Sequence, residues 1–393
     1  MKKIQEEIDK IEEGTILEIK LLNIDELNIL IHNTSAVIEK FHSMIEKSCE
    51  KFTHSKIVKI KDPSKIYVIL SDELHLAEKL AYMIYSQVQL YVDSEYPESY
   101  LKCSIGGIKF QNKNYNDIEK LLSHLNYSAT LVDGYTYYHS YEENPIDLDD
   151  IRQKNINLNL LRAALFKKEA KFAYQPIIDS KTKEIDYYEC LLRIPGLDKS
   201  YISAGPIIQD AEMKGLINIV DITVIEMVMD ELYRNPDLKL SVNVSNIGVL
   251  NKRLLHKIEQ LLKKYDVASR LIIEITETAL NQNIVITKNF ISVLHSYGCQ
   301  IALDDFGSGF TSFKQLLRLP IDIIKIDGAY IKDILNNEHH RFFVEALINL
   351  SHDLKIKTVA EFVETKDIAD YLAKIKVDGL QGNYFAAADE ERK

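Results

Sequence analysis

Eight short apolar runs in the second half of the chain constrain its fold more than any other feature. The runs are separated mostly by helical patterns, and they cover residues 172–178, 186–194, 238–244, 271–276, 300–304, 321–326, 357–360 and 377–380. Strands and helices alternating at this count predict a closed barrel of TIM type, a fold of the α/β class. The strand ends of such a barrel meet on one face, and active sites lie on that face.

Nearly every run ends in a side chain that can bind a metal ion or a phosphate. These residues are Asn243, Glu274, Asp304, Asp305, Lys325, Glu361 and Gln381, while Glu189 and Arg193 lie along the second run. One such residue is commonly a helix cap or a surface charge, but seven strands contributing together favour a shared site. The set offers carboxylate and amide oxygens without Cys or His, which suits Mg²⁺ or Mn²⁺ better than Zn²⁺. Two such ions promote attack on phosphorus, so we expect phosphodiester hydrolysis.

The fifth run ends in two adjacent carboxylates and a loop that contains glycines. Asp304 and Asp305 repel each other and lose hydration at such a place, which predicts a cation between them. For this pair alone, a strand-end Asp followed by a helix-capping Asp is the alternative. Gly307 and Gly309 allow the loop conformations that are closed to residues with a Cβ atom.

The second half resembles the EAL domain, the cyclic di-GMP phosphodiesterase module, from about Leu160 to the C-terminus. The motifs match in order and spacing, and they are Tyr174-Gln175-Pro176-Ile177, Glu189-Cys190-Leu191-Leu192-Arg193, Asn243-Val244-Ser245, Glu274-Ile275-Thr276-Glu277, Asp304-Asp305-Phe306-Gly307, Lys325-Ile326-Asp327, Ala360-Glu361-Phe362-Val363-Glu364 and Gln381-Gly382. The resemblance implies hydrolysis of cyclic di-GMP to linear pGpG with two Mg²⁺ or Mn²⁺ ions. A non-catalytic cyclic di-GMP receptor that signals through the first domain is the alternative, and an interaction protein with a structural barrel is a third possibility.

The resemblance also implies roles for individual residues. The metal ligands would be Glu189, Asn243, Glu274, Asp304, Asp305 and Glu361, with Asp304 bridging the two ions. Lys325 would hold or polarise the attacking water and Gln381 would help to position it, so these two count as catalytic together with Glu189 and Glu361. Substrate contacts are assigned to Gln175, Leu191, Arg193, Asp221, Asp327 and Glu364, and Glu277 would anchor the loop 305–312.

Three of these assignments have an alternative. Asp221, placed after an expected helix at 211–220, is equally consistent with an N-cap of the next helix. Arg193 is also consistent with a salt bridge to Glu189, and Glu364 with an exposed carboxylate at a helix start.

The chain departs from the family pattern at four places. Cys190 replaces Ala in the motif that names the family, and Phe362 replaces a common Gly between two glutamates, where its bulk would narrow the pocket. Asn383 stands where an aromatic residue is usual, and the end of the chain lacks the usual tail with a proline. None of these changes removes an expected metal ligand.

The first half predicts a smaller α+β domain that faintly resembles a GGDEF domain without its chemistry. After a short amphipathic helix within residues 1–13, we expect strands at 16–22, 57–61, 66–70, 101–109 and near 136–139, with helices at 24–51, 72–88 and 117–125. This order suggests an antiparallel sheet backed by helices. Ser104-Ile105-Gly106-Gly107 carries the resemblance, but the hairpin at 61–65 lacks glycines, Asn23 stands where the family has a metal-binding Asp, and the first arginine is Arg152.

We therefore expect a degenerate GGDEF-like regulatory or dimerisation domain at residues 1–146, a linker and helix start at 147–159, and the EAL domain at 160–393. A different α/β sensor fold is the alternative for the first domain. A homodimer is expected because barrels of this family often dimerise.

Charge and cysteine content narrow the possible partners and the compartment. The formal net charge of -11 argues against a protein that coats nucleic acid or an anionic membrane, because both need clustered Lys and Arg. The four cysteines are far apart, which suggests neither disulfides nor a zinc site. No apolar run approaches the length of a membrane span, so we expect a cytoplasmic protein without a membrane segment.

Overall fold

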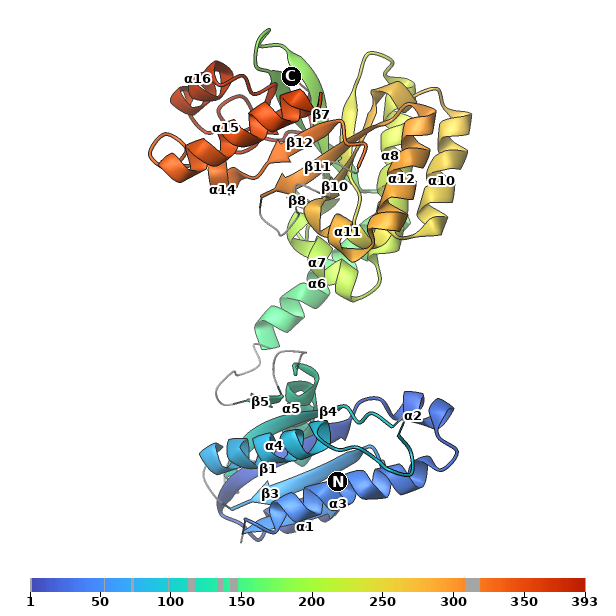
Figure 1. Cartoon of the computed structure of the whole chain (residues 1–393), viewed down its shortest axis with the longest axis vertical. Coiled ribbons are helices and arrows are strands. Elements are labelled where there is room, and N and C mark those ends of the chain that lie inside the picture. The colour runs from blue at the N-terminus through green and yellow to red at the C-terminus, as the bar shows by residue number, and fades with distance from the viewer. Residues whose placement is uncertain are drawn as a thin grey trace. The chain divides into compact units, whose positions relative to one another are not determined.

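The chain divides into two compact units in the computed structural model, Met1–Leu148 and Asp149–Lys393 (Figure 1). The structure describes residues 2–52, 54–71, 74–97, 99–111, 117–132, 137–141, 148–307 and 319–392. The boundary expected between residues 146 and 147 lies outside the described residues. Among the described residues, no helix is both long enough and apolar enough to span a membrane.

A five-stranded sheet forms the middle of the N-terminal unit, with the strand order β2-β3-β1-β4-β5. Its strands are β1 (Glu13–Leu21), β2 (Ser55–Lys59), β3 (Lys65–Leu70), β4 (Cys103–Gln111) and β5 (Tyr138–Ser140). Three of the pairings are antiparallel, but β4 and β5 are parallel. The sheet is therefore mixed, not antiparallel throughout as expected, because α5 (Ile118–Thr130) forms a crossover between these two strands.

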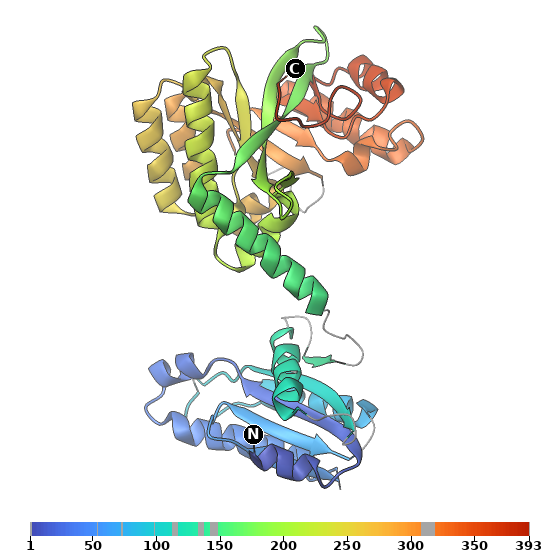
Figure 2. The same cartoon turned by 180° about the vertical axis from the view of Figure 1, so that it is seen from behind.

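Helices cover both faces of this sheet (Figures 1 and 2). Alternate residues of β1 pack against α3 (Thr34–Cys49) and α4 (Leu74–Gln89) on one face, and the others face α1 (Lys2–Ile8) and α5. The single helix expected from Ile24 to about Lys51 is wrong, since α2 (Ile24–Leu30) ends before α3 begins. The cause is Asn33, whose side chain accepts a hydrogen bond from Ala36 N and caps α3.

Eight strands of the second unit close into a barrel, which confirms the predicted fold class. The ring order is β6-β14-β13-β12-β11-β10-β9-β7, and β7 pairs with β6 to close it. The strands are β6 (Lys171–Asp179), β7 (Ile185–Pro195), β9 (Leu240–Asn243), β10 (Leu271–Thr276), β11 (Gln300–Phe306), β12 (Ile323–Ile326), β13 (Lys357–Ala360) and β14 (Gly379–Leu380), with β8 (Tyr201–Ser203) added beside β7.

One strand of the barrel runs against the others. β6 is antiparallel to both of its neighbours, whereas the remaining pairings around the ring are parallel. The turn at 180–184 is too short for a crossover helix, so β7 must return antiparallel to β6. The barrel therefore differs from an all-parallel TIM barrel at this first strand.

Helices surround the outside of the barrel (Figures 1 and 2). They are α6 (Leu148–Lys167), α7 (Gly205–Met213), α8 (Ile217–Arg234), α9 (Asn246–Val249), α10 (Lys252–Lys264), the 3₁₀ turn η1 (Ala268–Arg270), α11 (Glu277–Gln282), α12 (Ile284–Tyr297), α14 (Gly328–Ile331), α15 (Glu338–Asp353) and α16 (Lys366–Lys374). The helix expected at 211–220 is wrong, because Gly215 adopts a φ of +72° and separates α7 from α8.

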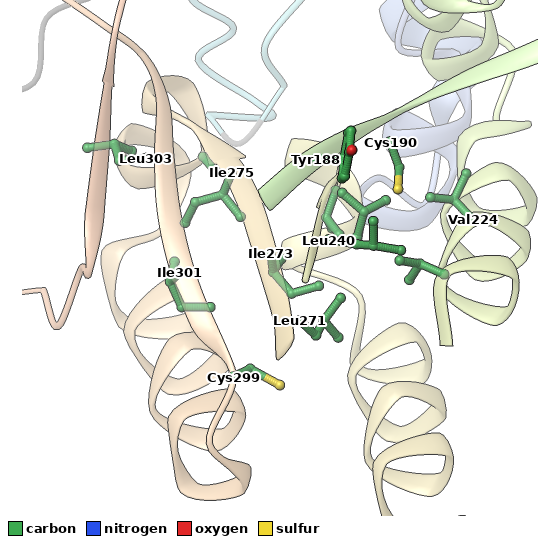
Figure 3. Packing of buried hydrophobic residues seen from close by; sticks show 14 of the residues in the cluster. Tyr188, Cys190, Val224, Leu240, Leu271, Ile273, Ile275, Cys299, Ile301 and Leu303 are labelled. Atoms are coloured by element: carbon green, nitrogen blue, oxygen red, sulfur yellow. The ribbon is translucent and has the colours of Figure 1, made fainter. Parts of the chain in front are cut away.

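The two-residue period of the strands separates the core from the barrel interior. Outward side chains such as Ile273, Ile275 and Leu303 pack in the layer between strands and helices (Figure 3). Inward side chains form an apolar layer across the barrel, made of Ile177, Tyr187, Ile272, Ala302, Ile323 and Val359. Polar residues lie two positions further along each of these strands, and two positions earlier on the antiparallel β6. The apolar layer is therefore the floor of a polar site.

Candidate active site

All eight barrel strands contribute one inward polar side chain to the layer above the apolar floor. In ring order from β6 these are Gln175, Gln381, Glu361, Lys325, Asp304, Glu274, Asn243 and Glu189. Glu361 and Gln381 directly follow β13 and β14. The structure thus brings together five of the six expected metal ligands and both residues expected to handle the attacking water.

Lys325 is the centre of this cluster. Its side chain is fully buried, and Nζ lies 2.7 Å from Glu274, 2.9 Å from Glu361, 3.1 Å from Asp304 and 3.2 Å from Glu189. The Asp304 contact is an ion pair without hydrogen-bond geometry. Although burial lowers the pKa of Lys325, the four carboxylates raise it well above its ordinary value, so this lysine is charged.

Amide side chains hold Glu189 in place. Asn243 Nδ2 donates to Glu189 Oε1 at 2.8 Å, and Gln381 Nε2 donates to Glu189 Oε2 at 2.7 Å. The same Gln381 nitrogen donates to Gln175 Oε1 at 3.0 Å. Burial raises the pKa of Glu189, but Lys325 and the two amides outweigh this effect and lower it. Glu189 is therefore ionised.

The other carboxylates of the cluster do not have enough positive charge beside them to stay ionised. Burial raises the pKa of Glu274 well above its ordinary value, and Glu189 and Asp304 add to this effect against the pull of Lys325. The pKa of Glu361 rises to about 8, again mainly through burial. One ammonium group therefore does not balance the negative charge that the strands bring together.

A bulge in β11 places two consecutive acidic residues at the site. Leu303 pairs with Ile324 and Phe306 pairs with Ile326. Between these two pairs β11 has two residues and β12 has one, so β11 contains one extra residue. Bulges of this kind redirect side chains next to active sites. Asp305 lies in the bulge with a φ of +54°, and its carboxylate, that of Asp304 and that of Glu361 have oxygens within 4.8 Å of one another.

The donor chemistry of the cluster fits a hard divalent cation. Glu274 Oε1 and Gln381 Oε1 are buried and have no hydrogen-bond partner among the described residues. Partial burial and the charge of Asp304 raise the pKa of Asp305 to about 6. Unpaired buried oxygens and carboxylates that resist ionisation fit an oxygen-ligand site for a hard divalent cation.

A pocket of about 440 Å³ adjoins the cluster. Asn243, Asp304 and Asp305 line it together with the expected substrate residues Leu191, Arg193 and Asp221. Arg193 Nη1 donates to Leu192 O at 3.2 Å and to Ser203 Oγ at 3.3 Å. Among the described residues, Arg193 makes no salt bridge with Glu189. The alternative explanation of Arg193 as the partner of Glu189 in a salt bridge is therefore wrong.

Asp221 lies inside α8, so its alternative reading as a helix N-cap is wrong. It accepts hydrogen bonds from Ser245 N at 3.2 Å and from the Ser245 hydroxyl at 2.6 Å. Ser245 in turn caps α9 and follows Asn243 by two residues. Asp221 therefore holds the segment that carries Asn243 as well as lining the pocket, a link that the sequence did not reveal.

Asp327 and Glu364 come after β12 and β13 and are not part of the polar layer, but Asp327 is close enough to Asp305 for its charge to add to burial and to Asp304 in raising the pKa of Asp305. Asp327 Oδ1 accepts a hydrogen bond from Ala329 N at 2.7 Å and caps α14. Glu364 is exposed before α16. The expected loop anchor Glu277 accepts a hydrogen bond through Oε2 from Gly307 N at 3.2 Å. Residues 308–312 of that loop lie outside the described residues.

Phe362, expected to narrow the pocket, is half-exposed and is not among the described residues that line the 440 Å³ pocket. Its ring packs on Gly328 and lies 4.3 Å from Lys332 Nζ. Its φ of +53° explains why a glycine suits this position in the family.

The C-terminal segment lies along β6 despite the missing proline. Gln175 Nε2 donates to Ala386 O at 3.4 Å, and Asp389 pairs with Tyr174 on β6. Arg392 is 2.8 Å from Glu231 on α8. This segment therefore supports Gln175 next to the cluster.

Comparisons with known proteins agree with this geometry. The Escherichia coli (strain K12) protein named cyclic di-GMP phosphodiesterase PdeF is 31% identical over 238 residues, which cover 59% of this chain and 32% of that protein. The chain spans about a third of the length of the curated relatives it matches.

Solved structures show the same fold. The PaMucR phosphodiesterase in complex with c-di-GMP has a TM-score of 0.54 at 27% identity, covering 59% of this chain and 97% of that one. The Vibrio cholerae LapD structure described as S helix-GGDEF-EAL has a TM-score of 0.55 and covers 95% of this chain and 89% of that one. At 20% identity, the LapD likeness concerns the fold alone.

The EAL domain family matches residues 158–388, which is more than half of the chain. The match spans the barrel and every residue of the polar cluster. The chain therefore belongs to the EAL domain family.

Proposed function

We propose that the barrel is a divalent-metal-dependent phosphodiesterase that hydrolyses cyclic di-GMP to linear pGpG. The observation that carries this proposal is the excess of carboxylates around one buried lysine. A barrel kept only for structure or for protein contacts would gain nothing from buried acids that cost stability. The relatives named as cyclic di-GMP phosphodiesterases support the choice of substrate.

The charge balance of the cluster supports two Mg²⁺ or Mn²⁺ ions. Its carboxylates are Glu189, Glu274, Asp304, Asp305 and Glu361. With Lys325 charged, their full ionisation leaves a formal charge of about −4, which two divalent cations balance. These carboxylates and Asn243 would hold the ions, and bound ions would supply an activated water and charge stabilisation at phosphorus.

The residues of the chain then orient the reactants. Lys325 is buried and charged, so its N–H groups are fixed donors that hold the attacking water, and Gln381 positions that water through its unpaired Oε1. Arg193 lies in the pocket with only Nη1 engaged among the described residues, which leaves guanidinium donors for a substrate phosphate. The apolar floor excludes water from below the cluster.

The N-terminal unit is proposed to regulate the barrel and to have no cyclase activity. The amide of Asn23 is engaged at both ends, because Nδ2 donates to Tyr100 O at 2.6 Å and Oδ1 accepts from Lys102 N at 3.0 Å. In the hairpin before β3, Asp62 accepts hydrogen bonds from Ser64. The side chains of Asn23 and Asp62 are therefore already engaged in hydrogen bonds within the domain. In addition, no arginine that could bind a triphosphate precedes Arg152.

Several finer assignments remain part of this proposal. They are a GGDEF-like domain at 1–146, a linker at 147–159, the EAL domain at 160–393, a homodimer and a cytoplasmic location. The LapD likeness over 95% of the chain is consistent with the fold of the first assignment.

Incubation of the protein with cyclic di-GMP and Mg²⁺ or Mn²⁺ tests the activity, with products separated by chromatography. We expect pGpG from the wild type and none from Glu189→Ala. Glu184→Ala is the matched control, because this glutamate is exposed on the turn between β6 and β7. Binding of cyclic di-GMP without turnover in the presence of either metal would contradict the proposed phosphodiesterase activity and indicate a receptor. Absence of binding would contradict both.

A further inference from the structure

We propose that Tyr330 is a positioning residue that fixes the β11 bulge and thereby the carboxylates of Asp304 and Asp305. Tyr330 lies on α14, outside the cluster, and its hydroxyl donates to Gly307 O at 2.9 Å. The inference rests on the proposed function in one respect, namely that these two aspartates bind ions.

The bulge needs an anchor at its downstream end. Asp305 and Gly307 adopt φ values of +54° and +103°, so two residues out of three have left-handed backbone conformations. For Asp305 this conformation is sparsely populated, and it persists only where surrounding contacts impose it. Beyond the pair formed by Phe306 and Ile326, the one bond among the described residues that continues the strand pairing is the weak 3.4 Å bond from Asp327 N to Phe306 O.

Gly307 is held on both sides at this point. Its N–H donates to Glu277 on α11, and its carbonyl accepts from Tyr330 on α14. A Cβ atom added at Gly307 would lie 2.7 Å from the Tyr330 ring and 3.2 Å from Phe343, so only glycine allows this close approach. The two polar backbone atoms of one residue are thus tied to two different helices.

The Tyr330 ring is itself immobilised by its neighbours. It stacks on Phe343 with ring centroids 4.3 Å apart and meets the edge of His340 at 5.1 Å, both on α15. Aromatic packing of this kind restricts the ring, so its hydroxyl is aimed at Gly307 O before any ligand arrives. The hydroxyl therefore acts as a fixed support for the turn, not as a mobile surface group.

Tyr330→Phe tests this inference because it removes the hydroxyl and keeps the ring. The matched control is Tyr371→Phe on α16, where the lost hydroxyl bond, 2.7 Å long, goes to Glu345 on α15 and does not involve Gly307 or β11. Mn²⁺ binding is measured by the spin-resonance signal of the free ion. We expect the affinity of Tyr330→Phe to fall about threefold to tenfold, the scale of one net hydrogen bond. The control should bind as the wild type does.

Kinetics and amide hydrogen exchange complete the test. At fixed Mn²⁺, kcat of Tyr330→Phe should fall while KM for cyclic di-GMP stays within about twofold, because the expected substrate residues Leu191, Arg193 and Asp221 of the pocket are unchanged. In metal-free protein, peptides covering 301–307 should exchange faster in Tyr330→Phe than in the wild type or in Tyr371→Phe.

Unchanged exchange at 301–307 together with unchanged Mn²⁺ affinity would overturn the inference. A wild type that binds no Mn²⁺ would refute the proposed function instead. In that case the exchange experiment still decides whether Tyr330 fixes the bulge.

Discussion

Asp93 in the N-terminal unit and Glu274 in the barrel are both buried carboxylates, but their surroundings differ. Asp93 accepts hydrogen bonds from Lys40 at 2.9 and 3.0 Å, from the Tyr91 hydroxyl at 2.8 Å, and from backbone N–H groups. Although burial raises the pKa of Asp93, these donors lower it to about 2. Glu274 shares one lysine with three other acids and keeps an unpaired oxygen, and its pKa is raised.

This difference separates a structural charge from a functional one. The surroundings of Asp93 satisfy it, so it contributes to stability without any ligand. The barrel cluster is stable only with protons or cations added, because its own lysine is insufficient. A buried acid whose pKa is raised by neighbouring acids therefore identifies the region that binds something from outside.

The largest effect should come from neutralising an acid of the cluster. Glu274→Gln removes one charged ligand, so turnover of cyclic di-GMP should fall roughly 10²–10³-fold, the scale of one lost preorganised electrostatic contact. Asp93→Asn, the same chemical change in the other unit, should leave turnover unchanged. Steady-state kinetics under saturating Mn²⁺ measure both, and equal losses would break the comparison.

Removing the central lysine should destabilise the metal-free barrel. Lys325→Met leaves four acids without a buried counter-charge, a loss of about 3–5 kcal/mol in the free energy of unfolding. The melting temperature in EDTA should then fall by roughly 10 °C, as expected for a domain of this size. Calorimetry measures the shift. Lys40→Met should have a smaller effect, because Asp93 keeps Tyr91 and its backbone donors.

The two units should respond to pH in opposite directions when metal is absent. Glu361 has a folded pKa of about 8, so between about pH 4.5 and 8 the folded barrel holds a proton that the unfolded chain has released. Barrel stability should therefore fall as pH rises through this window. Asp305, with a pKa of about 6, adds a smaller part because it is more exposed.

Asp93 has the reverse sign. Its folded pKa is lowered to about 2, so the ionised carboxylate stabilises the folded state above about pH 4. This stabilisation is lost as the pH falls toward 2. Hydrogen exchange resolved by unit, recorded in EDTA across this range, measures both trends. Glu361→Gln should flatten the barrel profile, and a barrel that becomes more stable from pH 5 to 8 in EDTA would contradict the charge account.

The smallest effect is expected beside the cluster but outside it. Phe362→Gly changes a residue that follows Glu361 directly, yet its ring does not line the pocket. Turnover should stay within about twofold of the wild type, because no ligand or pocket residue moves. A loss of tenfold or more would show that Phe362 takes part in substrate binding.

The positions of the polar residues were predictable from the sequence because strands alternate with a period of two. Glu274 and Lys325 end their runs in the inward register, so a barrel must bring them together. The reversed direction of β6 follows from the short turn at 180–184, although the run pattern alone did not show it. The break after α2 depends on one Asn33 cap, which helical periodicity does not register.

Other parts of the site depend on tertiary packing that no local pattern encodes. Alternation would send Asp304 and Asp305 to opposite faces, and only the bulge against β12 brings both carboxylates to the cluster. The contacts of Asp221 with Ser245 and of Tyr330 with Gly307 join residues more than 20 positions apart. Such contacts appear only when the helices are placed on the barrel.

A titration of thermal stability with Mn²⁺ tests the central claim most directly, namely that the barrel cluster lacks positive charge that divalent cations supply. In the wild type at neutral pH, the barrel melting temperature should rise as Mn²⁺ is added. At a hundredfold excess of Mn²⁺ over Kd, binding should increase the free energy of unfolding by about 2.7 kcal/mol. Glu274→Gln should melt higher than the wild type in EDTA and respond much less to the ion. A wild-type barrel whose melting temperature does not change with Mn²⁺ or Mg²⁺ would contradict the account.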